Sequence, residues 1–154
     1  MEARNDKKRR RQARFVYGGF GFPVVLTDVP MIRVRGVWTP DVNYERLREV
    51  LLAVLAEKPA RFTGDEVRFV RLSFDMTLQE FADRFGVTHP AVLKWERAGG
   101  KSTAMTWAIE KDIRLFLLSR RKVKAVQFLK VYRELEEQPR GPREPVKLHV
   151  PDVA

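Results

Sequence analysis

Three side chains that follow Thr88 could contact the edges of DNA bases. His89 and Pro90 come directly after this threonine, and Lys94 comes about one helical turn after Pro90. Lysine and histidine can donate hydrogen bonds to the O6 and N7 acceptors of guanine, and the proline ring can pack on a thymine methyl group. On a helix that begins at Thr88, these side chains project outward. We therefore interpret His89, Pro90 and Lys94 as candidate base-reading residues.

Other polar residues near this helix are candidates for contacts with the phosphate backbone. Thr88 would lie at the start of the helix, and Gln79 would lie at the start of the helix before it. Contacts of this kind fix the register of a protein on DNA without reading the sequence. The complete set of predicted backbone contacts is Gln79, Thr88, Lys101, Ser102 and Thr103.

Helix-capping patterns predict the elements that position these residues. The segments 63–66 and 77–80 both have the capping-box form, a threonine followed three residues later by a glutamate. They predict one helix ending near Phe74 and a second over 78–85, which Gly86 ends in a left-handed conformation. Thr88 then begins a third helix that runs to about Ala98, where Gly99 and Gly100 stop it. Two further helices are expected over 104–118 and 122–137.

This pattern resembles the Xre/Cro helix-turn-helix family over residues 63–100. The resemblance is carried by Leu78 to Ala82, by Phe85 to Thr88, and by Val92, Trp95 and Glu96. In that family the third helix ends in a Trp-Glu or similar pair, and its glutamate commonly meets an arginine of the first helix. The resemblance thus implies a structural ion pair between Arg71 and Glu96, and it implies that the outward side chains of the third helix face a DNA groove.

The wider layout, from Tyr17 to Leu118, resembles the MqsA-like (YgiT-type) antitoxins, which join an N-terminal lobe to an Xre-type domain. The resemblance implies an autorepressing antitoxin of a type II toxin-antitoxin module, whose N-terminal lobe binds a toxin. Typical members hold that lobe together with four zinc-binding cysteines. This chain has no cysteine, so we expect the aromatic residues of the lobe to form its core instead.

The remaining segments complete a predicted α+β organisation. Residues 1–14 are predicted to be a basic disordered arm, and residues 15–60 a lobe with a small β-ribbon and a helix over 43–57. The ribbon would pair strands around a glycine turn in 15–26, and a further strand would run from Met31 to Trp38, because apolar and polar residues alternate there. An Xre-type domain is predicted over 61–118. Residues 119–154 are predicted to form a C-terminal helix and, because prolines recur, an extended tail.

Composition favours a polyanionic partner. The chain carries a net charge of +10, which suits binding to double-stranded DNA. The charge is uneven, since residues 63–98 hold five basic and six acidic residues. No apolar run approaches the ~20 residues of a membrane helix, and we expect a cytoplasmic protein without membrane contact. No cofactor and no metal site are predicted, because His89 and His149 stand at no ligand spacing.

Other classes of function remain open or are disfavoured. No phosphate-binding loop or nucleophile–base arrangement is present, and Glu110 and Asp112 are expected to face solvent, so we do not predict an enzyme. A stand-alone regulator without a toxin, or a module that uses the same helices to bind protein, remains an alternative. We also expect a homodimer through the fourth or fifth predicted helix, because both are rich in apolar residues: Phe116, Leu117, Val126, Phe128 and Leu129.

Overall fold

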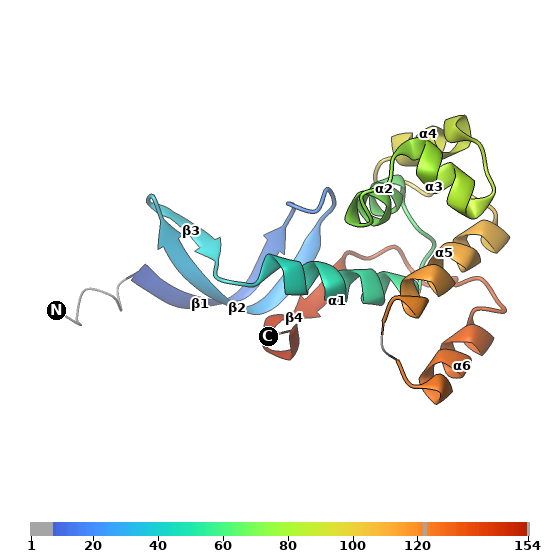
Figure 1. Ribbon diagram of the computed structural model, residues 1–154. Helices are drawn as coiled ribbons and strands as arrows, with labels where there is room; N and C mark the ends of the chain where they lie inside the picture. Colours follow the sequence, from blue (N-terminus) through green and yellow to red (C-terminus); the bar gives the residue numbers. More distant parts are fainter. Residues whose placement is uncertain (1–7, 122, 154) are drawn as a thin grey trace. The chain divides into compact units, whose positions relative to one another are not determined.

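The chain folds into an N-terminal sheet followed by a run of helices, and a C-terminal strand returns to the sheet (Figure 1). The computed structural model describes residues 8–121 and 123–153. The described residues form two compact units, one up to Val50 together with the segment from Pro145, and the other from Leu51 to Glu144. The elements are β1 (Arg9–Tyr17), β2 (Val24–Val34), β3 (Val37–Pro40), α1 (Tyr44–Ala56), α2 (Gly64–Ser73), α3 (Leu78–Phe85), α4 (His89–Arg97), α5 (Trp107–Ser119), α6 (Ala125–Glu134), β4 (Val146–His149) and α7 (Val150–Val153). No helix in the described part of the chain has the length and apolar character needed to cross a membrane.

Strand β2 is the centre of the sheet. β1 pairs antiparallel with it from Val24 to Ile32. The other edge of β2 is shared, because β4 pairs in parallel with residues 24–27 and β3 pairs antiparallel with residues 31–34. The central position of β2 explains why its side chains form the core of this unit: Val24, Val25, Leu26, Val29 and Met31 are all buried.

The expected single strand over 31–38 is instead the two arms of a tight hairpin. Arg35 and Gly36 both have positive φ, 50° and 81°, as the two central residues of a type I′ turn require. Val34 and Val37 therefore pair across the turn. The alternation of apolar and polar residues was correctly identified, but Gly36 turns the chain back where we expected it to end a strand.

The prediction that residues 1–14 form a disordered arm is wrong for the part of this segment that the structure describes. Residues 9–14 are the first two thirds of β1 and are hydrogen bonded along β2. The central strand supplies the backbone partners that this charged segment cannot supply by itself. The first seven residues lie outside the described part of the chain.

The predicted extended tail is also only partly correct. Val146 and Leu148 are buried whereas Lys147 and His149 are exposed, which is the period-two pattern of a half-buried strand. Thr27 Oγ1 lies 2.9 Å from His149 Nδ1 across this pairing. The domain boundaries that we expected, 15–60 and 119–154, therefore change, because the end of the chain completes the N-terminal unit.

The second unit contains the helices that the capping patterns predict. Both capping boxes are present, with Thr63 and Thr77 accepting hydrogen bonds from the backbone of Glu66 and Glu80 while each glutamate accepts one in return. The apolar sides of these helices meet in one core, which includes Phe62, Val70, Phe81, Val92, Ile113 and Leu117.

Four charged side chains are buried beneath these helices. The prediction that Glu110 faces solvent is wrong: Glu110 is fully buried and pairs with Arg114 one turn later on α5, at 3.0 Å. Arg114 also donates to the carbonyl oxygens of Lys58 and Ala60, and burial lowers its pKa. Lys58 Nζ in turn donates to both carboxylate oxygens of Glu66, at 2.5 and 2.8 Å. This network fixes the 58–62 segment on α2 and α5.

Candidate nucleic-acid interface

A short turn joins α3 to α4 and determines where α4 begins. Gly86 ends α3 with φ of 69°, a conformation that costs other residues about 1–2 kcal/mol. The N–H of Val87 returns to the carbonyl of Ala82 at 2.9 Å. Thr88 then caps α4 by accepting a hydrogen bond from Ala91 N, and Pro90 lies in the first turn, where its missing N–H is not needed.

The two sides of α4 differ sharply. Val92 and Trp95 are buried, whereas Pro90, Lys94 and Arg97 are exposed and follow one another at helical spacing. His89 is half-buried at the N-terminal end. The predicted base-reading residues thus lie together on or beside the exposed side of α4. Sequence analysis missed Arg97, although its position seven residues after Pro90 places it on the same side of a helix.

The ion pair between Arg71 and Glu96 is present. Arg71 Nε and Nη2 donate to the two carboxylate oxygens of Glu96 at 2.7 and 2.8 Å. Both side chains are nearly buried, with 12% and 8% of their surface exposed, and the hydrogen bonds to Glu96 raise the pKa of Arg71. Arg71 Nη1 also donates to the carbonyl of Met76. One side chain of α2 therefore holds both α4 and the loop before α3.

A close backbone contact holds the other end of α4. A Cβ atom on Gly64 would overlap the carbonyl oxygen of Trp95 and the nitrogen of Gly99. The backbone of Gly64 and Asp65 donates to the carbonyls of Lys101 and Gly99, at 3.2 and 2.9 Å. The first turn of α2 therefore lies directly against the C-terminal end of α4, and only glycine fits there.

The predicted phosphate-contacting residues differ in how exposed their side chains are and in the hydrogen bonds that they already make. Thr88, Lys101 and Ser102 are exposed near the two ends of α4. Gln79 is exposed as well, but its amide donates to Asp83 at 2.8 Å. The assignment of Thr103 is wrong, because this residue is buried and its hydroxyl accepts a hydrogen bond from Met105 N.

The internal ion pairs explain how a nearly neutral segment can present a basic surface. Glu96 is the one acidic residue of α4, and it is turned inward onto Arg71. Glu66 is likewise turned inward onto Lys58. The exposed side of α4 therefore carries Lys94 and Arg97 without an acidic neighbour on the same helix. Other acidic residues lie on the elements that pack against α4: Glu80 and Asp83 on α3 are exposed, and Asp65 in the first turn of α2 is half-buried.

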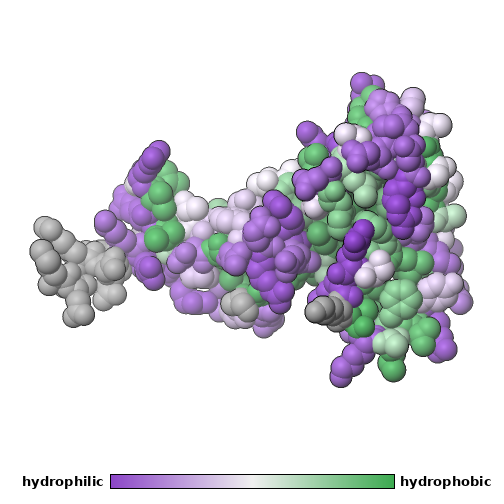
Figure 2. Space-filling view, in the orientation of Figure 1, coloured by the Kyte–Doolittle hydropathy of each residue, from purple (hydrophilic) through white to green (hydrophobic). Residues whose placement is uncertain are grey.

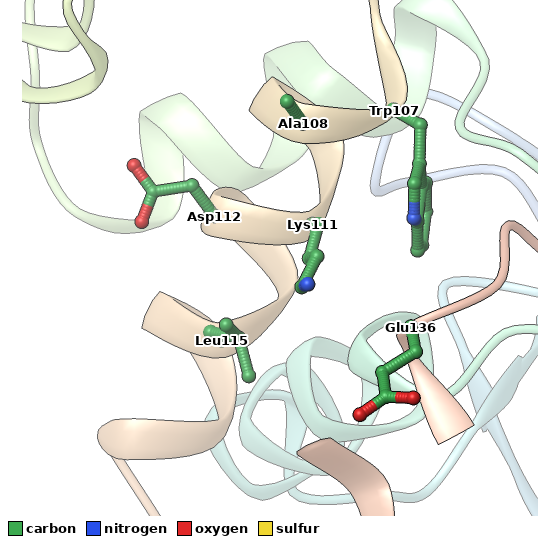
Figure 3. A pocket seen from close by; sticks show the side chains of 6 residues that line it. All are labelled: Trp107, Ala108, Lys111, Asp112, Leu115 and Glu136. Carbon is green, nitrogen blue, oxygen red and sulfur yellow. The ribbon is translucent and has the colours of Figure 1, made fainter. Parts of the chain in front are cut away.

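An open hollow of about 370 Å³ lies beside α5 in the same unit, and its charged groups do not converge (Figure 3). Trp107 and Glu136 lie along one side of it and Lys111 points between them, whereas Asp112 points away from both. Within the described residues, no three histidine or carboxylate side chains are grouped so that they could hold a metal ion. The exposed side of α4 is therefore the stronger candidate site.

Comparisons of the chain with protein-family models, with curated proteins and with solved structures found no match.

Proposed function

We propose that the protein is a sequence-specific DNA-binding transcriptional regulator that reads the major groove with the exposed side of α4. One observation carries the proposal: α4 is anchored on its inner side and exposes Pro90, Lys94 and Arg97, with half-buried His89 at its N-terminal end and no acidic residue among the four. A helix of this width fits the major groove. In the Xre/Cro family that the sequence resembles, the equivalent helix is the one that enters DNA.

The roles of the residues follow from their chemistry and position. Lys94 and Arg97 can donate to guanine O6 and N7, and an arginine can do so through two parallel bonds. His89 lies at the N-terminal end of α4, the part of a recognition helix that contacts base edges. Thr88, Lys101 and Ser102 can donate to phosphate oxygens and set the register.

The same proposal includes a homodimer that binds a palindrome. Two copies of α4 about 34 Å apart would enter successive major grooves. The expected use of Phe116 and Leu117 in the dimer is wrong, because both are buried within the unit. On α6, by contrast, Val126, Leu129 and Tyr132 are 80%, 50% and 44% exposed, so α6 is the proposed dimer helix. A strictly monomeric mass at micromolar concentration would contradict this.

An autorepressing antitoxin is the specific form of regulator that we propose, with a toxin bound by the N-terminal unit. A stand-alone Xre-type regulator would use α4 in the same way. The second candidate is a protein-interaction module, and the exposed apolar side of α6 favours it, because large exposed apolar residues commonly mark interaction surfaces.

Selection of genomic DNA fragments from the source organism tests the proposal. The wild-type protein is compared with His89→Ala/Lys94→Ala and with Arg68→Ala, which removes one charge from the exposed side of α2. We expect a palindromic motif with the wild type and the control, and loss of the motif with the double variant. Enrichment without any motif, equal in all three proteins, would show that α4 does not read DNA and would favour the protein-interaction module.

A further inference from the structure

The end of the sheet that contains the β2–β3 turn is strongly basic. We call residues 8–14 and 33–37 the ribbon end. They include no acidic residue and seven basic ones, all exposed: Lys8, Arg9, Arg10, Arg11, Arg14, Arg33 and Arg35. Figure 2 shows that hydrophilic side chains surround a small hydrophobic patch there.

The strand register distributes these charges over both faces of the sheet. The guanidinium of Arg10 lies 4.3 Å from the centre of the Trp38 ring, and Arg33 is the direct strand partner of Trp38. Arg10 and Arg33 therefore share one face. Because side chains alternate along a strand, Arg9 and Arg11 lie on the opposite face.

Little of this charge is neutralised within the sheet. Arg11 pairs with Asp28 at 2.8 Å, and it is the one basic residue of the ribbon end with an acidic partner among the described residues. The buried side chains of β2 end at Met31, and Val34 and Val37 beyond it are 49% and 64% exposed. Clustered like charges repel one another. An external polyanion would remove that repulsion.

We propose that the ribbon end is a second DNA-binding site, which binds backbone phosphates whatever the DNA sequence is. Same-face neighbours on a strand are about 6.8 Å apart, and duplex DNA presents a negative charge every ~1.7 Å of its axis, so adjacent arginines can each reach a phosphate. Protein interfaces have an apolar core depleted of charge, whereas DNA interfaces are polar and strongly positive. The ribbon end, with two exposed valines among seven cations, matches the second description.

This inference rests on the N-terminal unit and does not depend on α4. The test compares Arg33→Thr/Arg35→Asn with the wild type. Threonine favours strands, and Asn-Gly is the preferred sequence of a type I′ turn, so the variant keeps the hairpin. The matched control is Arg46→Gln/Arg48→Gln, which removes two charges from α1, where each arginine lies beside a glutamate of the same helix.

The measurement is the salt dependence of binding to a mixed-sequence duplex. Each lost phosphate contact lowers the slope of log K against log salt by about 0.9, so we expect the ribbon variant to lose about 1.8 and the control to keep the wild-type slope. Equal slopes for all three proteins would overturn the ribbon site and leave the proposal for α4 intact. A reduced slope in the ribbon variant, together with unaltered motif selection by His89→Ala/Lys94→Ala, would support the ribbon site and refute α4. Reduced binding to polyglutamate with an unchanged DNA slope would assign the ribbon end to an acidic protein instead and overturn the proposal.

Discussion

The ion pair between Arg71 and Glu96 should account for a large part of the stability of the helical unit. Replacing Glu96 by glutamine keeps the shape of the side chain and removes its charge. Breaking a buried ion pair from one side costs about 3–5 kcal/mol. Roughly a tenth of each side chain is exposed, and the glutamine oxygen can still accept one hydrogen bond. We therefore expect Glu96→Gln to lower the free energy of unfolding by about 2–3 kcal/mol.

Tryptophan fluorescence during urea unfolding measures this effect directly, because buried Trp95 precedes Glu96 on α4. A loss of 2–3 kcal/mol in a unit of this size corresponds to a decrease in Tm of roughly 10–20 °C. The control is Glu134→Gln in the same unit. Glu134 lies 3.9 Å from Lys130 with both side chains largely exposed, and such a surface pair contributes ~1 kcal/mol or less.

A double-mutant cycle separates the charge interaction from the loss of packing. Arg71→Met and Glu96→Leu should each destabilise the unit, because each leaves the other charged side chain without its partner in a nearly buried place. Arg71→Met/Glu96→Leu should recover part of the loss, since neither charge is then stranded. If Glu96→Gln and Glu134→Gln shift the urea midpoint equally, α4 is not held by this pair, and our account of its orientation is wrong.

Two further predictions concern the C-terminal end of α4 and the sheet. Gly64→Ala should lower the free energy of unfolding by about 1–3 kcal/mol, because the methyl group meets the backbone of Trp95 and Gly99; Gly100→Ala, where the added atom meets open space, should have no effect in the same urea titration. Asp28→Asn should reduce Tm at neutral pH but not in acid. The hydrogen bond from Arg11 lowers the pKa of Asp28, so its contribution to stability is present above the unfolded pKa and is lost as the pH falls through the folded one. Equal Tm differences at both pH values would contradict that account.

Local signals in the sequence were sufficient to predict the helical unit. Thr63, Thr77 and Thr88 cap the three helices as expected, and Gly86 has the left-handed conformation that its position required. Each signal acts within a few residues, where backbone donors at a helix start need an acceptor. The exposed side of α4 follows from the same periodicity.

The features that could not be predicted from the sequence depend on contacts between residues that are far apart in the chain. β4 pairs with β2 across more than a hundred residues, as the contact between Thr27 and His149 shows. The prolines near the C-terminus obscured the short alternation from Val146 to His149. Glu110 and Arg114 have the spacing of an exposed helical ion pair. This pair is buried because the 58–62 segment supplies further partners: Arg114 donates to the carbonyl groups of Lys58 and Ala60, and the N–H of Phe62 donates to Glu110.

The residues that hold α4 are different from those that would touch DNA. Arg71, Glu96 and Gly64 fix the helix from its inner side and from its C-terminal end, and none of them belongs to the exposed side. Lys94 and Arg97 are exposed, and as basic residues in the last turn they favour the C-terminal end of the helix. Substitutions on the exposed side should therefore change DNA selection while the unit stays folded. The His89→Ala/Lys94→Ala variant keeps the residues that anchor α4. If it loses the DNA motif, the loss can therefore be attributed to the two removed side chains and not to a displaced helix.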